Sequence, residues 1–586
     1  MFNRYFQEEL THLRDLGKEF SRAHPALAPM LAGATPDPDV ERLLEGVAFL
    51  TALLRQKLDD EFPEFINELM QLIWPHYLRP IPSTTLIAFT PKPNLRQSMT
   101  IPSDIQVASI PVEGTSCLFR TCYEVEVHPL TLLDASFAQP SGQPPMIKLL
   151  FELKGLKLSD WQPRSLRLFL AGDYPEASDL YLLLNRHLRR IHMKPFEKGK
   201  SCSLGPEELR YKGFSDKEAL IPYPSHAFPG YRIIQEYFIS PQKFLFIDLT
   251  GWEQWQERGG GSRFEVHFEL KDLPFSPPRI KKDHFVLSVT PAINIFPHEA
   301  DPIQINHRMT KYLIRPAGSK PEHYQVYSVQ SVVGYVQGTA QERQYVPFEV
   351  FNPDPHAHPV YRITIRQSPL REILDLFLSV AYPPGIGLPP SETLSIQLLC
   401  TNGALPENLR LGDISLPTSS SPEVVEFKNI LPPTVSLLPP LEGRKEGEKG
   451  GENLRWRLLA HLFLNTLSLS RMENLKALFE QYIFPGSRNL TYTLANRKRI
   501  EGIEGLVAKP SDRLVSGILM RGQEIELKLR QEKFASQGDM YLFGSVLDHF
   551  LGNYASLNHF TRLTVQEVTK GESYQWPARI GDHPLI

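Results

Sequence analysis

Residues 37–64 read DPDVERLLEGVAFLTALLRQKLDDEFPE, a helix-forming stretch that ends in a cluster of acids. Asp37 can cap a helix, Pro38 suits its first position, and the acids that follow face the positive end of the helix dipole. Apolar side chains recur on two sides of this helix, with Val40, Leu43, Leu44, Val47, Leu54 and Leu58 on one and Phe49, Ala52 and Leu53 on the other. A single neighbour cannot cover both sides, so we expect the helix to lie among several others, some of them from a second chain.

The acids themselves, Asp59, Asp60, Glu61 and Glu64, admit two interpretations. Paired carboxylates can bind a divalent cation or perform acid and base chemistry, but calcium loops interleave their acids with Gly and Asn, which DDEFPE lacks. The same acids also suit the start of a new helix, with Pro63 in its first turn. We therefore predict that the chain turns at the acids and that a second helix runs on to the proline-rich WPHYLRPIPS.

The composition indicates a multidomain protein that does not bind nucleic acid. A chain of 586 residues exceeds one compact core, and 41% apolar residues are enough for roughly three or four domains. The 63 basic residues nearly balance 66 acidic ones, which leaves no positive excess for a phosphate backbone.

The cysteines and the N-terminus both favour the cytoplasm. Four scattered cysteines, Cys117, Cys122, Cys202 and Cys400, are too few for a disulfide framework, and we expect reduced and mostly buried thiols. The amphipathic start does not match a secretory signal. No segment approaches the roughly 18 uninterrupted apolar residues that a membrane span requires.

The predicted fold class is a multidomain α+β chain. The first part reads as helices, whereas most of the 52 prolines fall after it, where strands such as RFEVHFELKDL alternate apolar and polar residues. We predict a helical segment at 1–82, β-rich sandwich-like or barrel-like modules at 83–290 and 291–440, a charged glycine-bearing linker at 441–452, and a mixed α+β domain at 453–586.

No catalytic, cofactor-binding or metal site is predicted. His356 and His358 in PDPHAHPVYR would point the same way from a strand, and HEAD at 298–301 is another metal-like cluster, but neither brings a complete set of ligands. The nucleophile, metalloprotease, P-loop and dinucleotide motifs are absent from the sequence. A carboxylate pair for sugar hydrolysis is set by distance in space, and the sequence singles none out.

What remains is interaction surface. The candidate partner interface takes six residues from the first stretch and three from the apolar C-terminal tail ESYQWPARIGDHPLI. These residues are Leu43, Val47, Phe49, Leu50, Leu53, Leu54, Trp576, Pro577 and Leu585. We expect the tail to dock either on its own domain or on a neighbour.

Several of these segments resemble one family, TssF, a baseplate component of the bacterial type VI secretion system. The N-terminal matches are YFQEELTHLRDLGKEFSRAHP, the opening stretch and PHYLRPIPS, and the C-terminal ones are FGSVLDHFLGNYASLNHFTRLTV and WPARIGDHPL. EHYQVYSVQSVVGY and LLAHLFLNTLSLS fit more loosely. The resemblance is specific at both ends and weak in the proline-rich middle.

The resemblance implies a scaffold similar to the wedge proteins of contractile phage baseplates, with no reaction and no cofactor. In the family, two TssF copies wrap one TssG, the resulting wedges join TssK and TssE, and six of them surround the VgrG spike at the inner face of the inner membrane. The helical N-terminal part would then enter a bundle shared among three chains. The alternatives are a wedge protein of a related phage-like contractile machine, or a carbohydrate-active enzyme.

Overall fold

The computed structural model of the chain describes residues 2–23, 37–73, 75–224, 228–271, 273, 277–318, 320, 322–338, 342–348, 358–368, 371, 373–383, 391–439, 471–484, 490–515 and 518–581, and along 56–68 it describes the course of the backbone only. The chain divides into two compact units. The N-terminal helical unit contains the described helices at Phe2–Ala23 and Pro38–Ile73, and the main unit begins at Pro75 and contains the other described elements.

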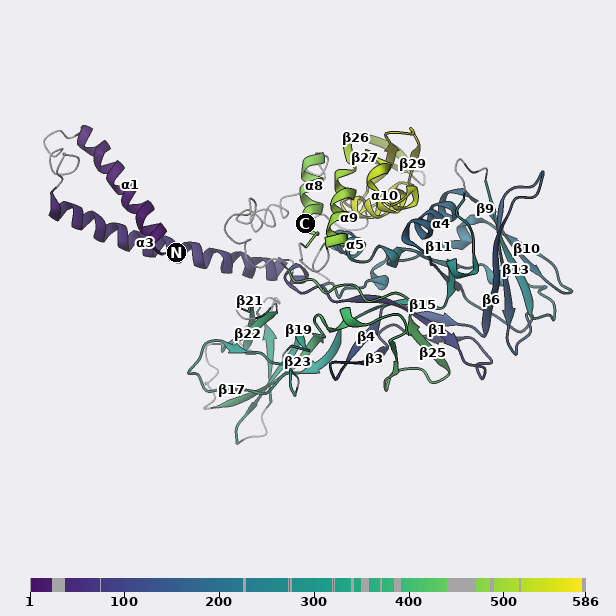
Figure 1. Cartoon of the computed structure of the whole chain (residues 1–586), viewed down its shortest axis with the longest axis horizontal. Helices are drawn as coiled ribbons and strands as arrows, with labels where there is room; N and C mark the ends of the chain where they lie inside the picture. The colour runs from purple at the N-terminus through teal and green to yellow at the C-terminus, as the bar shows by residue number, and fades with distance from the viewer. Residues whose placement is uncertain are drawn as a thin grey trace. The chain divides into compact units, whose positions relative to one another are not determined.

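The N-terminal helical unit pairs α1 (Phe2–Ala23) with α3 (Pro38–Ile73) as an antiparallel hairpin, drawn in purple in Figure 1. The predicted start of α3 is confirmed. The Asp37 carboxylate accepts a hydrogen bond of 2.9 Å from the backbone N–H of Asp39, and Pro38 occupies the first helical position.

The predicted turn at the acids is wrong. α3 is one helix of 36 residues that runs through Asp59–Glu64 without a break. The apolar residues that follow the acids keep the helical spacing, and the acids and the residues around them are acceptable helix formers. Continuing the helix therefore costs little beyond the backbone N–H that Pro63 lacks. The side chains of the acids lie outside the described residues.

A curved six-stranded sheet organises the first part of the main unit. Its strands, in spatial order, are β24 (Ile414–Pro417), β3 (Gln106–Val112), β4 (Thr115–Thr121), β15 (Val289–Ile293), β1 (Thr84–Pro91) and β25 (Val425–Asn429). The two edges approach each other, because Asn429 accepts hydrogen bonds from the backbone N–H groups of Gly412 at 3.1 Å and Ile414 at 3.0 Å. The sheet therefore curls like a barrel.

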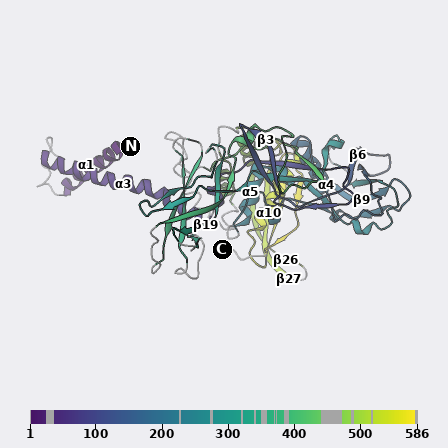
Figure 2. The same cartoon turned by 90° about the horizontal axis from the view of Figure 1, so that it is seen from below.

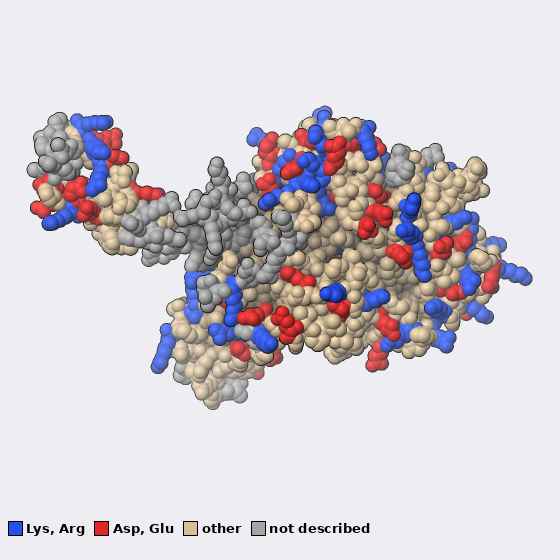
Figure 3. All heavy atoms as spheres, in the orientation of Figure 1, with Lys and Arg blue, Asp and Glu red and all other residues tan. Residues whose placement is uncertain are grey.

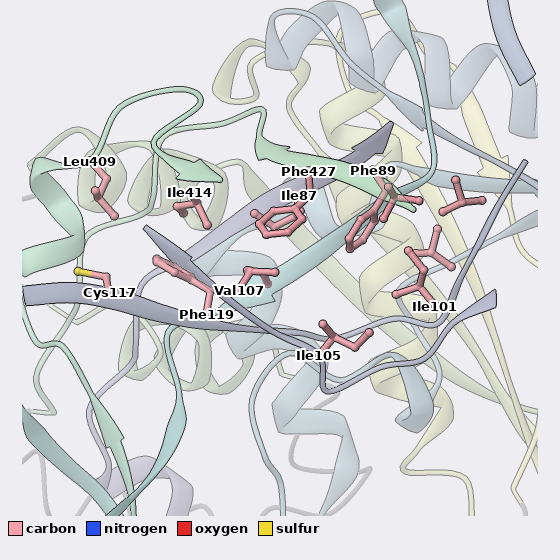
Figure 4. Close-up of a cluster of buried hydrophobic side chains, with 14 of the residues drawn as sticks. Ile87, Phe89, Ile101, Ile105, Val107, Cys117, Phe119, Leu409, Ile414 and Phe427 are labelled. Carbon is pink, nitrogen blue, oxygen red and sulfur yellow. The ribbon is translucent and has the colours of Figure 1, made fainter. Parts of the chain in front are cut away.

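A hydrophobic core fills the concave side of this sheet (Figure 4). Ile87 and Phe89 of β1, Val107 of β3 and Phe119 of β4 are at most 2% exposed and meet side chains from distant parts of the chain. Two short strands, β2 (Met99–Ile101) and β5 (Val125–Val127), contribute to the same core. The core thus depends on residues more than 300 positions apart.

Three further sheets complete the β-rich part. A five-stranded sheet has the order β10 (Cys202–Leu204), β9 (Leu188–Pro195), β13 (Arg263–Leu270), β7 (Met146–Leu153) and β6 (Leu130–Ala138). A four-stranded sheet has the order β11 (Leu209–Tyr211), β12 (Phe246–Leu249), β8 (Leu166–Leu170) and β14 (Phe285–Leu287). An eight-stranded sheet runs β16 (Phe296–Glu299), β23 (Glu392–Thr401), β19 (Gln325–Val336), β20 (Glu342–Pro347), β21 (Val360–Gln367), β22 (Leu374–Ala381) and β18 (Tyr312–Leu313), with β17 (Ile303–Ile305) also on β23.

The C-terminal region wraps helices and strands around one buried helix, α10 (Gln537–Gly552). Its sheet has the order β26 (Ile503–Val515), β27 (Ile518–Leu529), β28 (His559–Glu567) and β29 (Ser573–Gln575), with β30 (Arg579–Ile580) also on β28. α4 (Tyr174–His187) and α5 (Pro229–Ile239) pack on α10, as Figures 1 and 2 show. Every residue of α10 except His549 is buried, so this helix is central and not one-sided. α8 (Met472–Gln481) and α9 (Leu490–Glu501) complete the region.

The predicted fold class is confirmed, with helices first, β-rich sheets next and a mixed C-terminal region. The strand predicted from RFEVHFELKDL is β13. The predicted boundary near residue 290 lies within β15, in a sheet that takes strands from both predicted modules. The five-part division remains a prediction, and the linker predicted at 441–452 lies outside the described residues.

Candidate partner interface

The helical hairpin is built on small side chains. Leu10 of α1 and Ala48 and Ala52 of α3 are buried where the two helices meet, and both alanines are fully inaccessible. Alanines one turn apart let the helix backbones approach closely. The sequence predicts Ala52 on a second side of α3, and the structure shows α1 covering that side.

Ion pairs fix the direction of the hairpin. Arg14 of α1 lies 2.7 Å from Glu41 of α3, and Arg55 of α3 lies 2.7 Å from Glu9 and 3.6 Å from Glu8 of α1. Low residue numbers on one helix therefore meet high numbers on the other. Because these side chains are partly exposed, each pair contributes only about 0.2–1 kcal/mol.

An apolar face of α3 points away from α1. Leu43, Val47, Leu50 and Leu54 follow one another at spacings of four, three and four and are 42–70% exposed. These spacings place them on one helical stripe, as in a coiled-coil seam. Phe49 and Leu53 belong to the other predicted side of α3, and although α1 covers Ala52 on that side, these two side chains are 46% and 43% exposed. All six residues predicted from the opening stretch thus lie on accessible surface of the N-terminal helical unit.

The described part of the C-terminal tail docks on its own domain through Trp576. The Trp576 ring is buried, stacks on Tyr541 of α10 at 5.1 Å between ring centroids, and donates its indole N–H to the Ser545 hydroxyl at 3.2 Å. Of the two docking alternatives for the tail, the structure shows the internal one for Trp576. Pro577 is exposed, and Leu585 lies outside the described residues.

Three residues after Trp576, Arg579 binds two side chains near the end of α10. Arg579 forms an ion pair with the Asp548 carboxylate and donates to Nε2 of His549 at 2.7 Å. Burial raises the pKa of Asp548 to about 6, although Arg579 acts in the opposite direction. Burial, and then the charge of Arg579, lower the pKa of His549 well below its usual value. The segment from Trp576 to Arg579 is therefore held on α10 by the buried Trp576 ring and by the Arg579 guanidinium, which binds both Asp548 and His549.

Two fully buried carboxylates of the main unit are both paired with cations. Asp539 of α10 accepts two hydrogen bonds of 3.1 Å from Arg499 and further ones from Tyr174 and Tyr237. Glu236 forms an ion pair with Lys243, and the Glu236 carboxylate also accepts backbone N–H groups. Such saturated pairs hold helices together and have no open coordination or proton-transfer partner.

The candidate metal ligands do not form a site in the described part of the chain. His298 donates its Nε2–H to the backbone carbonyl of Ala317 at 2.9 Å, and its ring stacks on Tyr324. Across the described residues, no group of three ligating side chains converges. His356 lies outside them. The four cysteines are free thiols, and burial raises the pKa of Cys122 and Cys400 to about 12, which disfavours a thiolate.

A model of the family described as "Type VI secretion system, TssF" matches residues 1–583. The chain belongs to the TssF family. The TssF1 component of the Pseudomonas aeruginosa type VI secretion system is 29% identical over 633 aligned positions, which cover 99% of each chain.

Solved structures place this TssF protein in the same context. A chain of the TssK-TssF-TssG baseplate subcomplex of the type VI secretion system matches with a TM-score of 0.77 and 28% identity, over 93% of this chain and 99% of that one. A chain of the type VI baseplate complex matches with a TM-score of 0.56 and 23% identity over all of both chains, which supports the fold. This TssF protein is a structural subunit of the type VI secretion baseplate.

The segments that resemble TssF at the sequence level have structural roles in this chain. Two of the N-terminal ones contribute to the α1–α3 hairpin, and PHYLRPIPS begins the main unit with a buried 3-10 turn at Pro75–Leu78. The C-terminal ones contribute to α10, β28 and the segment from Trp576 to Arg579. In the described part of the chain, no helix is long and apolar enough to cross a bilayer.

Proposed function

We propose that this TssF protein acts as a scaffold whose N-terminal helical unit binds partner chains through the exposed apolar face of α3. The observation that carries the proposal is the stripe Leu43, Val47, Leu50 and Leu54, which lies on the side of α3 turned away from α1. Burying each leucine contributes about 1.5–3 kcal/mol before the costs of association. A helix that presents such a stripe fits the shared bundle expected of the family.

The partners proposed first are TssG and TssK, because the matching solved subcomplex contains both together with a TssF chain. The family resemblance adds a second TssF copy, TssE and the VgrG spike. We propose, on the same basis, that the assembly lies in the cytoplasm at the inner face of the inner membrane. These assignments rest on the relatives and on the character of α3.

We also propose that the chain catalyses no reaction. A sugar hydrolase needs two carboxylates that face each other across a cleft. Asp539 and Glu236, two fully buried carboxylates, are instead paired with Arg499 and Lys243. The matched relatives are described as baseplate components.

The test is to change Leu50 and Leu53 to Asp and to co-express the variant with TssG and TssK. Two carboxylates among the exposed apolar side chains of α3 cannot be buried without partners, so we expect TssG no longer to co-purify. The matched control is Leu411→Asp, because Leu411 is as exposed as Leu50, at 62%, but lies in the main unit. Co-purification of TssG with the double variant at the normal level would refute the α3 interface.

A further inference from the structure

A groove of about 440 Å³ opens on the surface of the main unit beside α9. One wall is formed by Tyr492 and Ala495 of α9, and the other by Pro432, Pro433 and Val435, which follow β25. Phe238, near the end of α5, also lines it. The volume lies within the range of binding pockets, and the walls are mostly aromatic, aliphatic and proline side chains.

The walls of the groove are held in place from behind. Asn496 of α9 donates to the backbone carbonyl of Phe238 at 3.0 Å, and Arg499 of α9 is anchored on Asp539. On the opposite wall, Thr434 is bound to Thr84 of β1, with the backbone N–H of Thr84 2.9 Å from the Thr434 hydroxyl. The groove is therefore preformed, which lowers the entropic cost of binding.

Positive charge gathers on the helix that forms the rim. Arg497 and Lys498 of α9 are exposed and form no ion pair with any described residue. Lys498 lies one turn from Ala495 and is therefore next to the groove. Lys533 hydrogen bonds to Glu501 at 2.8 Å, and the charges of Lys533, Lys476 and Lys498 together lower the pKa of this single carboxylate. Figure 3 shows the same concentration of Lys and Arg over α8 and α9.

We infer that this groove docks an acidic segment of a partner chain, which inserts an apolar side chain between α9 and residues 432–435 while a carboxylate of the segment faces Lys498. An apolar socket beside an unpaired cation is complementary to that chemistry. The exposed Leu494, on the next face of α9, extends the apolar surface toward the same rim. This inference rests on the proposed function, because it assumes a baseplate partner, and it assigns a contact separate from α3.

The test places a photo-activatable cross-linking residue at Ala495 in the full chain, co-purified with TssG and TssK. We expect cross-links to a segment of TssG or TssK that carries a net negative charge and an apolar residue. Reversing the charge at the rim with Lys498→Glu should reduce the cross-link at least fivefold. Arg497→Glu is the matched control, because Arg497 is also an exposed cation of α9 but faces away from the groove-lining positions Tyr492, Ala495 and Arg499.

Cross-links confined to the chain itself, to a second copy of it or to a basic segment would overturn the inference, and so would a yield unchanged by the charge reversal. A complex that forms normally but gives no cross-link would also reject it. Failure of the proposed function is seen in a different measurement: the variant with Leu50→Asp and Leu53→Asp would still co-purify with TssG, whatever the cross-link at Ala495 shows.

Discussion

At the scale of single residues, Arg579 binds two neighbours whose pKa values move in opposite directions. The raised pKa of Asp548 means that the folded chain takes up its proton earlier than the unfolded chain, so this group adds stability as the pH falls from about 6 toward 4. The lowered pKa of His549 means that the unfolded chain takes up the proton first, so this group removes stability as the pH falls below about 6.5.

The two effects should therefore oppose each other in mildly acidic solution. His549→Gln should make the thermal unfolding midpoint less sensitive to acid, whereas Asp548→Asn should make it more sensitive. For Asp548 the full effect corresponds to about 3 kcal/mol. Thermal unfolding of the three proteins between pH 4.5 and 7.5 measures the slopes, and equal slopes would contradict this assignment.

A second residue-scale prediction concerns two helical glycines. A Cβ at Gly544 of α10 would lie 2.5 Å from the Trp576 ring, whereas one at Gly46 of α3 would meet nothing within 4 Å. Gly544→Ala should cost about 1–3 kcal/mol and shift the tryptophan fluorescence, because the ring must move. Gly46→Ala is the control and should be neutral or stabilising by up to about 1 kcal/mol. Unchanged stability of the Gly544 variant would mean that the ring is not seated there.

Local sequence patterns predict the role of a single residue better than they predict which distant residue it contacts. The cap at Asp37 and the exposed leucines of α3 follow from residues within a few turns of one another. The pairing of Arg579 with Asp548 does not, because 31 positions separate the two residues and only the fold brings them together. For the same reason, the sequence predicts that the tail with Trp576 docks but leaves open whether it docks on its own domain or on a neighbour.

At the scale of elements, α3 shows how strongly a continuing helical pattern outweighs one breaker. The acids and Pro63 resemble the start of a new helix, yet one helix extends from Pro38 to Ile73, which is about 54 Å at 1.5 Å per residue. The hydrophobic spacing on both sides of the acids is the same, and this is the signal that favours one helix.

Replacing Pro63 by Ala should therefore stabilise α3. The variant regains a backbone donor in the helix interior, and we expect a gain of up to about 3 kcal/mol in local stability. Hydrogen exchange of the amides at 56–68 measures this as increased protection. Pro38→Ala is the control, because proline costs nothing at the first helical position. Lower protection in the Pro63 variant would indicate that the chain needs a turn there.

Some strands can be predicted from the sequence, but the strands that they pair with cannot. Alternation predicts β13, and the segments SLRLFLAG, KFLFIDLT, YRITIRQS and LSIQLLC also read as strands and form β8, β12, β21 and β23. β21 and β23 bury mainly one face, whereas all four residues of β12 are buried. The sheet order β24-β3-β4-β15-β1-β25 follows from pairings across the whole chain that no local pattern specifies. α9 escaped prediction because its exposed residues and its buried polar anchors, Asn496 and Arg499, leave no apolar stripe.

At the scale of the whole molecule, the chain divides into two compact units, and the α3 face that we propose as a partner interface belongs to the smaller one. The described contacts of the main unit, including the barrel-like sheet and α10, arise from Pro75 onward. The exposed α3 face belongs to the other unit.

Removing residues 1–74 should accordingly leave the main unit folded. We expect a β-rich circular dichroism spectrum and a cooperative thermal transition within a few degrees of that of the full chain, together with loss of TssG from the purified complex. Size-exclusion chromatography and thermal unfolding provide the measurement. An aggregated or unfolded product would show that the main unit depends on the helical hairpin.

The pairing of β1 with β25 also has a consequence during synthesis. Thr84 and Thr434, which are bonded to each other in the folded chain, are 350 positions apart. At about 5–20 residues per second, a ribosome takes roughly 20–70 s to deliver the second after the first. Throughout that interval β1 emerges with one of its edges unpaired and its core face unfilled, a state in which strands join the wrong neighbour. The rate of elongation, or a chaperone that binds the unfinished chain, should therefore determine how much of this subunit folds correctly and reaches the baseplate.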